Sequence, residues 1–189
     1  LTQAAMLAAY DIGQRCLGIG EGTHAGCFYR VSGLGILGIH FLFPILYGGS
    51  VAILPTHAYL DPDFWDGVRA HGINFLYVVP PIASLLVKEC PSPSIPFTLD
   101  DLLCVAGSAR LDPEIQRRFQ DRFAPLANIY GLSECGFAFL FGQRRGDRFD
   151  NSVGPAVGLE LRLLDADGDA ITVPGVQGRL QVRTPSLFE

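Results

Sequence analysis

The sequence predicts an α/β protein in which a mostly parallel β-sheet is flanked by helices and is followed by a small antiparallel β region. Through the middle of the chain, short apolar runs alternate with helical stretches, and the connections between them are short. After about residue 150, the pattern changes to alternating apolar residues with many glycines. The first pattern is typical of βαβ units with right-handed crossovers, and the second is typical of antiparallel hairpins.

Four strands are predicted, and each is a nearly continuous apolar run. They cover residues 50–55, 73–79, 102–107 and 125–130. Continuous apolar runs indicate strands whose two faces are both buried, so we expect helices on both sides of the sheet.

Three helices are predicted in the connections between these strands. Residues 60–72 and 111–123 both begin near an Asp-Pro pair. We expect Asp61 and Asp112 to cap these helices, because aspartate is favoured at the N-cap and proline is tolerated in the first turn. Residues 80–90 form the third predicted helix, which begins with proline.

Composition and charge argue against several classes of function. Of the 189 residues, 49% are hydrophobic and 17% are charged, which is enough for a sizeable core. The formal net charge is -5 and no basic stripe is present, which argues against a nucleic-acid partner. Residues 31–46 are the most apolar run, but glycines and a proline interrupt it, which favours a buried core helix over a membrane span. The five cysteines are scattered and show no CxxC spacing, which favours reduced thiols in a cytoplasmic protein. The four histidines show no metal-ligand spacing either.

Two structural parts are expected. Residues 1–150 form the α/β part, with a loop over residues 141–151, and residues 151–189 begin a small β-barrel. The first residues have the character of a helix interior, and the last residues carry no cap or tail. We therefore expect the chain to be a fragment of a longer protein.

Two loops leave neighbouring strands at the edge of the sheet where parallel α/β folds bind ligands. The first follows strand 102–107 and contains the small residues Gly107, Ser108 and Ala109, which allow the backbone to approach a flat ligand closely. An ordinary turn from strand to helix explains the same residues equally well.

The second loop follows strand 125–130 and has the sequence NIYGLSE. Tyr130 offers a ring for stacking on a base, and Gly131 permits a sharp turn. Ser133 can donate a hydrogen bond to a phosphate oxygen, and Glu134 can hold Mg²⁺, which favours one or two carboxylates together with phosphate oxygens. The alternative is a surface turn with a capping serine and a solvated glutamate.

Together these loops resemble motifs of the adenylate-forming superfamily, which includes acyl- and aryl-CoA synthetases, firefly luciferase and the adenylation domains of nonribosomal peptide synthetases. Residues 130–134 (YGLSE) are similar to its Tyr-Gly-x-Thr/Ser-Glu motif, and residues 106–114 (AGSARLDPE) resemble its Gly-Gly-Ala-Pro-Leu segment. Residues 41–55 resemble the helix and strand beside its acyl pocket, and residues 150–168 and 173–189 resemble the approach to its small barrel.

The resemblance implies a site for ATP or AMP and for a carboxylic acid. The implied nucleotide-binding residues are Gly107, Ser108, Ala109, Asn128, Tyr130 and Gly131. Ser133 would touch the α-phosphate and Glu134 would bind Mg²⁺, which makes these two the candidate catalytic residues. The implied acyl-pocket residues are Arg30, Val31, Gly33, Val79 and Pro80. Arg30 stands where the superfamily usually has histidine, so it either meets an anionic group or is a surface side chain.

The implied function is that of a fragment of an AMP-forming acyl- or aryl-CoA synthetase, which converts a carboxylate and ATP to acyl-AMP and pyrophosphate and then forms a thioester with CoA. One alternative is a stand-alone acyl-AMP ligase or a peptide-synthetase adenylation domain that loads a carrier protein. Another is a non-catalytic acyl- or nucleotide-binding module. We expect an apolar acid as substrate. We also expect this fragment to be inactive alone and to self-associate through exposed apolar surface.

Overall fold

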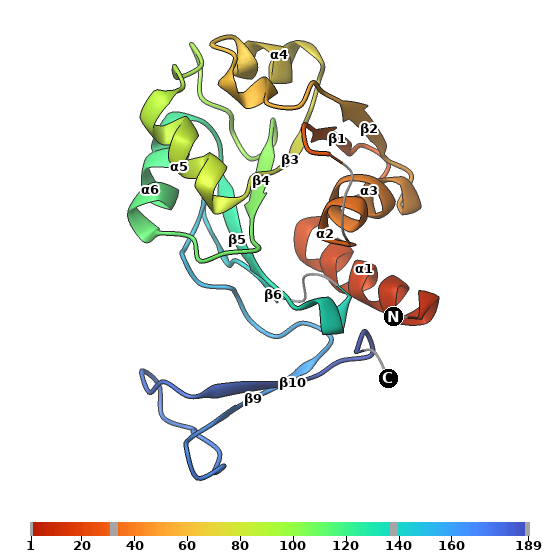
Figure 1. Ribbon diagram of the computed structural model, residues 1–189, viewed down its shortest axis with the longest axis vertical. Helices are drawn as coiled ribbons and strands as arrows, with labels where there is room; N and C mark the ends of the chain where they lie inside the picture. The colour runs from red at the N-terminus through yellow and green to blue at the C-terminus, as the bar shows by residue number, and fades with distance from the viewer. Residues whose placement is uncertain (1, 31–33, 137–139, 188–189) are drawn as a thin grey trace.

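The computed structural model describes residues 2–30, 34–136 and 140–187, in which six strands form one sheet with helices on both faces (Figure 1). The strand order is β2-β1-β3-β4-β5-β6. Neighbours from β2 to β5 pair in parallel, and β6 pairs antiparallel with β5. The predicted fold class is therefore confirmed. The strands are β1 (His24–Cys27), β2 (Ser50–Ile53), β3 (Phe75–Tyr77), β4 (Leu103–Ala106), β5 (Leu126–Tyr130) and β6 (Leu140–Phe141).

Strand β1 is not predicted by the sequence pattern, although it lies inside the sheet. Its sequence, HAGC, has no apolar run. β1 pairs on one side with β2 and on the other with β3, so its place is determined by backbone hydrogen bonds and by close packing. At Gly26, for example, an added Cβ would lie only 2.7 Å from Leu76 Cδ2. A small residue in a central strand is a sign of such close approach, not of a loop.

The helices form two layers that enclose the sheet (Figure 1). They are α1 (Gln3–Leu17), α2 (Leu34–Ile36), α3 (Phe43–Leu46), α4 (Phe64–Ala70), α5 (Pro80–Glu89) and α6 (Pro113–Arg122), with a π-helical segment η1 (Leu37–Leu42) and 3₁₀ turns η2 (Ala58–Leu60) and η3 (Ser133–Cys135). Helices α4, α5 and α6 pack on one face of the sheet, and α1, η1 and α3 pack on the other.

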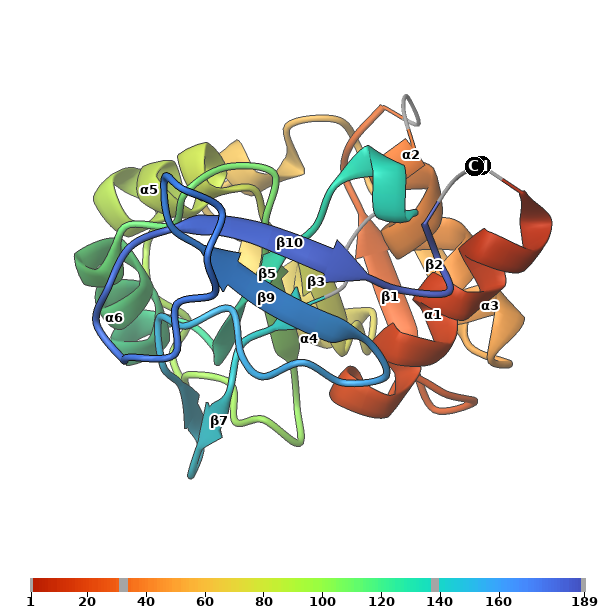
Figure 2. The ribbon, with the colours of Figure 1, turned by 90° about the horizontal axis from the view of Figure 1, so that it is seen from below.

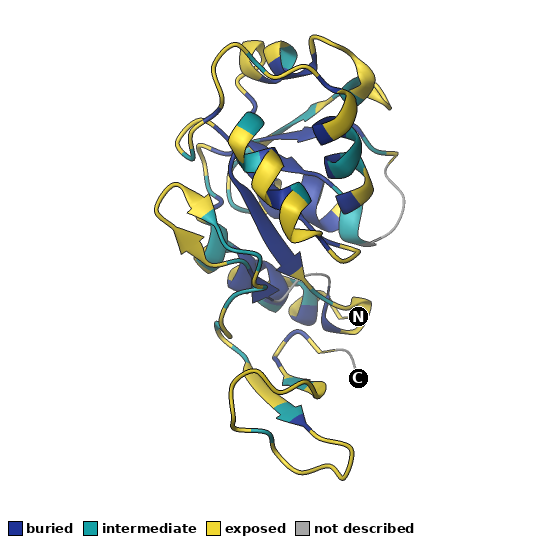
Figure 3. Ribbon diagram, turned by 90° about the vertical axis from the view of Figure 1, so that its left-hand side faces the viewer, coloured by how far each residue is buried: buried dark blue, intermediate teal, exposed yellow. Residues whose placement is uncertain are grey.

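Successive strand residues bury their side chains on opposite faces, as the pleat requires. In β3, Leu76 packs in the cluster that contains Trp65 of α4, whereas Phe75 and Tyr77 pack in the cluster that contains Phe43 of α3. Strands β1, β3, β4 and β5 are buried through their middle, the edge strand β2 is only partly buried, and the outer helix faces are exposed (Figure 3). The prediction that both faces of the sheet are covered is confirmed.

The two Asp-Pro pairs behave differently. Asp112 caps α6 as predicted, because its Oδ1 accepts hydrogen bonds from the N–H groups of Glu114 and Ile115. The prediction for Asp61 is wrong, since α4 begins only at Phe64. Asp61 Oδ1 instead accepts a hydrogen bond from Asp63 N–H at 3.0 Å, which closes a local turn before the helix.

Two other helical expectations also need correction. Helix α1 begins at Gln3, where Thr2 Oγ1 accepts a hydrogen bond from Ala5 N–H, so the first described residues cap a helix and do not have the character of a helix interior. Residues 34–46 are helical, as expected for the apolar run 31–46, but residues 31–33 lie outside the described residues. This segment is buried on one side only, because Ile45 and Leu46 are exposed. Within the described chain, no helix combines the length and apolarity needed to cross a membrane.

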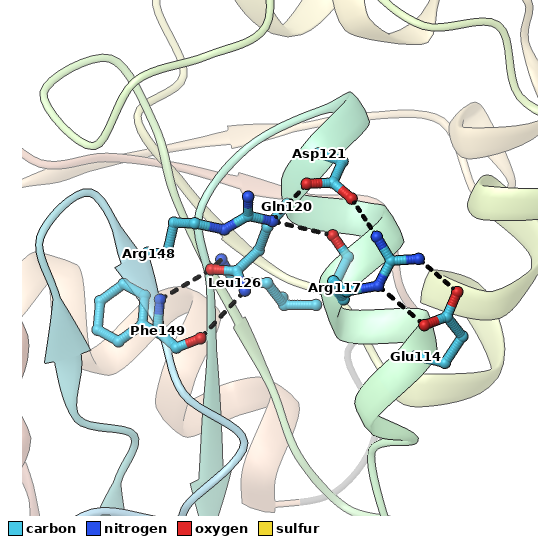
Figure 4. A network of polar contacts seen from close by, with 7 residues as sticks. All are labelled: Glu114, Arg117, Gln120, Asp121, Leu126, Arg148 and Phe149. Atoms are coloured by element: carbon cyan, nitrogen blue, oxygen red, sulfur yellow. Dashed lines mark hydrogen bonds and ion pairs between the residues drawn. The ribbon is translucent and has the colours of Figure 1, made fainter.

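The predicted loop at residues 141–151 contains a short hairpin of β7 (Arg144–Arg145) and β8 (Arg148–Phe149), which is fastened to α6 (Figure 4). Arg148 Nη2 lies 2.7 Å from Asp121 Oδ1. Gln120 donates to Phe149 O and accepts from Phe149 N–H at 2.8 Å. These contacts hold the chain that follows β8 close to α6 and β5.

The C-terminal part forms the antiparallel pair that the sequence predicts. Strand β9 (Glu160–Leu164) pairs with β10 (Arg179–Arg183), and the pair lies to one side of the main sheet (Figures 1 and 2). Asp165 Oδ1 accepts from the N–H groups of Asp167 and Asp169, which stabilises the turn after β9. Val182 packs against the small cluster of Cys135 and Leu140. The division into domains at residue 150 and the barrel stay predictions.

Candidate active site

A pocket of about 470 Å³ opens where β4 and β5 end side by side. This is the edge of a parallel sheet at which α/β folds bind ligands. The lining residues are Ser108, Ala109, Arg110, Leu111, Asn128, Ile129, Tyr130, Gly131, Asn151 and Val153. The pocket is therefore built from both loops that the sequence singled out and from a third segment, residues 151–153.

The structure brings together five of the six predicted nucleotide-binding residues: Ser108, Ala109, Asn128, Tyr130 and Gly131 all line this pocket. Gly107 is the exception. It is buried, and an added Cβ there would lie 2.6 Å from Ile129 Cγ1. Glycine at this position therefore lets β4 and β5 pack closely, which is a structural reason independent of any ligand.

Ser108 has an unusual backbone conformation for a residue with a side chain. Its φ is 70°, in the left-handed region, and its Oγ lies 2.6 Å from the hydroxyl of Tyr77 on β3. The Ser108 hydroxyl is therefore directed toward β3, while the turn that follows it forms one wall of the pocket. The sequence pattern does not single out Tyr77, because it lies within an apolar strand.

The opposite side of the pocket depends on a network of amide side chains. Asn128 Nδ2 donates to Asn151 O at 3.2 Å, and Asn151 Nδ2 donates to Gln116 Oε1 at 2.8 Å. Gln116 is buried on α6 and donates to the carbonyl oxygens of Leu126 and Asp150. The network fixes residues 150 and 151 beside β5, so Asn151 and Val153 reach the pocket.

Sequence reasoning missed five lining residues: Arg110, Leu111, Ile129, Asn151 and Val153. Arg110 and Leu111 follow the predicted small residues directly, and Ile129 lies within the predicted strand. The position of Asn151 could have been found from one signal only, the glutamine Gln116 on a helix face that otherwise carries Ile115, Phe119 and Phe123 toward the core.

Ser133 and Glu134 lie just beyond the pocket. They form the start of η3, two and three residues after the lining residue Gly131, and both are exposed. The turn packs closely on α1, since an added Cβ at Gly136 would lie 2.8 Å from Ala9 Cβ. The backbone that carries both side chains is thus held in place although the side chains face solvent.

The predicted acyl-pocket residues are spread over a neighbouring region. Val79 follows β3, and its N–H donates to the hydroxyl of Tyr29 at 3.1 Å. Pro80 begins α5 and is buried, whereas Arg30 is exposed. None of these three lines the pocket of Tyr130. Val31 and Gly33 lie outside the described residues.

The rings of Tyr29, His40 and Tyr77 pack together between the two regions. Their centroids lie 5.2 Å apart for Tyr29 and His40 and 5.4 Å apart for His40 and Tyr77. His40 belongs to η1, and its Nδ1 donates to Gly26 O at 3.2 Å. This cluster links β1, β3 and η1 through aromatic contacts that contribute beyond their buried area.

We expect the free energy of unfolding to fall as the pH decreases from about 6.5 to about 4, because of His40. Its imidazole is fully buried, and burial lowers the pKa of His40 to about 4, although the hydrogen bond to Gly26 opposes this. In this window the unfolded state binds a proton that the folded state does not, so stability is complete above the unfolded pKa and is lost toward acid. The loss is on the order of 3 kcal/mol, at roughly 1.4 kcal/mol for each unit of pKa shift.

Urea unfolding at a series of pH values measures this dependence. The control is His40→Leu, which removes the titrating imidazole and fills the site with an apolar side chain of similar size. An equal acid slope in both proteins would contradict the assignment to His40.

A metal site made of protein groups alone is not found in the part of the chain that the structure describes, since no three His, Cys, Asp or Glu residues are grouped suitably there. Glu134 is an exposed carboxylate next to the hydroxyl of Ser133. Its chemistry fits Mg²⁺ held by one carboxylate together with phosphate oxygens and water, which is the usual arrangement for this ion.

Comparisons with known proteins agree with this geometry. The sequence model of the family described as AMP-binding enzyme matches residues 33–189. The chain is 32% identical over 157 residues to a benzoate–CoA ligase of Thauera aromatica, covering 79% of this chain and 28% of that protein. It is 35% identical over 154 residues to the nicotinic acid–CoA ligase pyr1 of Aspergillus fumigatus, covering 78% of this chain and 26% of that protein.

The fold is also similar to solved structures. ATP-bound MatB from Rhodopseudomonas palustris matches with a TM-score of 0.82 at 20% identity, covering 100% of this chain and 37% of that chain. This likeness shows the fold. The chain spans about a quarter of the length of the two relatives named above. Since the family model covers most of the chain and the relatives agree with it, the chain belongs to the adenylate-forming family of AMP-binding enzymes.

Proposed function

We propose that this chain is part of an AMP-forming ligase that joins a carboxylic acid to a thiol, with CoA as the acceptor. The observation that carries the proposal is the pocket at the ends of β4 and β5, in which Tyr130, Asn128 and the small residues Ser108 and Ala109 meet. An aromatic ring opposite a wall of small residues fits a flat purine base, and the amide of Asn128 offers both a hydrogen-bond donor and an acceptor.

The reaction has two steps. A carboxylate oxygen of the acid attacks the α-phosphorus of ATP and the bond to pyrophosphate breaks, which yields acyl-AMP. The thiol of CoA then attacks the acyl carbon, AMP leaves, and the thiol proton is released. The protein contributes little covalent chemistry to such a phosphoryl transfer, so positioning and electrostatic stabilisation are its main roles.

In the first step, we assign the adenine to the space between Tyr130 and the wall formed by Ser108 and Ala109, with Gly131 allowing close backbone approach. Asn128 lies at the edge of the base. Ser133 donates a hydrogen bond to an α-phosphate oxygen. Glu134 would hold Mg²⁺, which would supply positive charge beside the phosphate groups.

The acid would lie beside the nucleotide pocket, near Val79 and Pro80, with Arg30, Val31 and Gly33 at its other side. The partly buried ring of Tyr29 and the buried ring of Tyr77, next to Val79, support an apolar acid. Because two relatives are named for benzoate and nicotinic acid, we propose aryl acids as the first class to test. A cytoplasmic location is part of the same proposal.

The test is acid-dependent ATP–pyrophosphate exchange by the intact protein from which this chain comes, with a panel of aryl and alkyl carboxylic acids. Thioester formation is then compared with CoA and with a phosphopantetheinylated carrier protein. Exchange with at least one acid and transfer to CoA are expected, and transfer to the carrier alone would replace CoA as the acceptor. Absence of exchange with every acid would favour a non-catalytic nucleotide-binding protein.

The 189-residue chain alone serves as a control. We expect no exchange from it, because it spans only about a quarter of the length of the relatives that are named as CoA ligases. It should also sediment as a species larger than a monomer. β2 is an edge strand, and the exposed apolar side chains of Ile45, Leu46 and Ile53 lie on or near it.

Tyr130 should act through its ring more than through its hydroxyl. Base stacking on an aromatic side chain contributes about 1–3 kcal/mol, so Tyr130→Ala in the intact enzyme should raise the KM for ATP by roughly tenfold or more. Tyr130→Phe keeps the ring and should leave the KM within about twofold of the unmodified enzyme's. Steady-state exchange at varied ATP concentration measures both. Equal losses in the two variants would mean that the hydroxyl is the important group.

A further inference from the structure

The hydrogen bond between Tyr77 and Ser108 joins the core of the sheet to the wall of the pocket. The two hydroxyl oxygens are 2.6 Å apart, and the residues are separated by 31 positions in the chain. Tyr77 ends β3, and Ser108 lies two residues after the end of β4. The side chain of Tyr77 therefore tethers the turn after β4 to the neighbouring strand β3.

The left-handed backbone conformation of Ser108 is unfavourable for a residue with a side chain, so Ser108 would leave it if nothing held it there. A φ of 70° brings Cβ close to the backbone, and apart from Ser108 only His57 among the described residues with a side chain has a positive φ. Such a conformation persists where surrounding contacts hold it. The turn it creates directs Ala109 and Arg110 along the pocket, so a return to negative φ would move this wall.

Tyr77 is well suited to act as the anchor. Its side chain is only 3% exposed, and its ring is held edge-on by the rings of Tyr29 and His40. Burial raises the pKa of Tyr77, while the hydrogen bond to Ser108 lowers it. The phenol consequently keeps its proton, and its partner Ser108 lies on an exposed turn.

We propose that Tyr77 is a positioning residue for the nucleotide pocket: its hydroxyl holds Ser108 in the left-handed conformation that sets the wall opposite Tyr130. The proposal rests on the proposed nucleotide site. It assigns a role in ATP affinity to a residue of the buried sheet that does not line the pocket. Tyr77 acts through Ser108 and is not a catalytic residue.

The test combines two substitutions in the intact enzyme. Tyr77→Phe removes the hydroxyl and keeps the ring, and it should raise the KM for ATP by roughly three- to tenfold, the range expected for the loss of one hydrogen bond, while kcat changes little. Glycine adopts positive φ without a tether. The Ser108→Gly variant therefore serves as a second background. The KM for ATP of the double variant Ser108→Gly, Tyr77→Phe should differ by less than about twofold from that of Ser108→Gly alone.

A matched control is Tyr59→Phe. Tyr59 also makes a hydrogen bond through its hydroxyl, to His57 Nδ1 at 3.0 Å, but it lies on η2 away from the pocket. This variant should leave the KM for ATP unchanged. If Tyr77 had a purely structural role, Tyr77→Phe would lower thermal stability, and its effect on the KM for ATP would not depend on the residue at position 108.

Two results would overturn the proposal. One is a KM for ATP that Tyr77→Phe does not change, and the other is an equal rise in both backgrounds. A crystal structure of the Tyr77→Phe variant gives a readout that does not need activity, since Ser108 should leave the left-handed region, and retention of a φ near 70° would refute the tether. An enzyme without ATP-dependent exchange would count against the proposed function, and this structural readout would still decide the role of Tyr77.

Discussion

Replacing Glu134 by glutamine in the intact enzyme should lower the rate of acid-dependent ATP–pyrophosphate exchange by about 100-fold and leave the fold intact. Loss of one well-placed charged group at the point where charge develops costs roughly 3 kcal/mol in activation free energy, which corresponds to this factor. Glutamine has nearly the same size and is uncharged, so the change isolates the carboxylate. Glu134 is exposed and its backbone is held by η3 on α1, so stability should change little.

The measurement is pyrophosphate exchange at saturating ATP and acid over a range of Mg²⁺ concentrations. A matched control is Glu114→Gln, since Glu114 is also an exposed glutamate, here in the first turn of α6, and its carboxylate pairs with Arg117 on the helix surface. This control should retain its exchange rate. Near-normal exchange by the Glu134 variant at every Mg²⁺ concentration would remove Glu134 from the mechanism.

Replacing Trp65 by alanine should lower the free energy of unfolding by about 3–5 kcal/mol, the usual cost of deleting a fully buried indole. Trp65 lies on α4 and is 2% exposed. Its ring stacks on Phe123 with 4.8 Å between centroids and contacts Phe64 edge-on at 5.0 Å. Alanine would leave a cavity among rings from α4, α6 and the residue that follows α6, and these elements cannot collapse into it without moving the helices.

Urea unfolding followed by circular dichroism measures the loss as a shift of the midpoint. Trp65→Phe should cost less than the alanine variant, because a ring still fills part of the space. Leu60→Ala, at a 59% exposed position in nearby η2, should change stability by less than about 0.5 kcal/mol. A Trp65→Ala midpoint equal to that of Leu60→Ala would show that the aromatic cluster does not stabilise this face of the sheet.

Much of the fold follows from local patterns in the sequence. The apolar runs that became β2, β3, β4 and β5 and the capped start of α6 were predictable because apolar runs and N-capping leave clear signals in single segments, although β2 proves to be an edge strand with Ile53 exposed. The elements that the sequence analysis missed or misassigned depend on contacts between segments, or on a local turn that resembles a helix cap. β1 has no apolar run, since it gains its stability from two neighbours, and Asp61 looks like a cap but closes a separate turn.

The candidate site shows the same division. The segments around Ser108 and Tyr130 were identified from the types of residue that follow two strands, because the carboxyl ends of parallel strands meet at one edge of the sheet. Asn151 was not found, because its place depends on the amide network of Gln116 and on the hairpin that Gln120 holds. These contacts join residues that are about 30 positions apart in the chain, and no local pattern reports them.

The sequence by itself determined the α/β class, the order of the middle strands and helices, and the residue types of the two loops, since these depend on the periodicity and composition of single segments. Only the tertiary structure decided that β1 lies between β2 and β3, that residues 151–153 complete the pocket, and that Tyr77 reaches Ser108. The physical reason is that backbone pairing and side-chain hydrogen bonds between distant segments are selected by packing in three dimensions, where a small or polar residue gains its role from its neighbours in space.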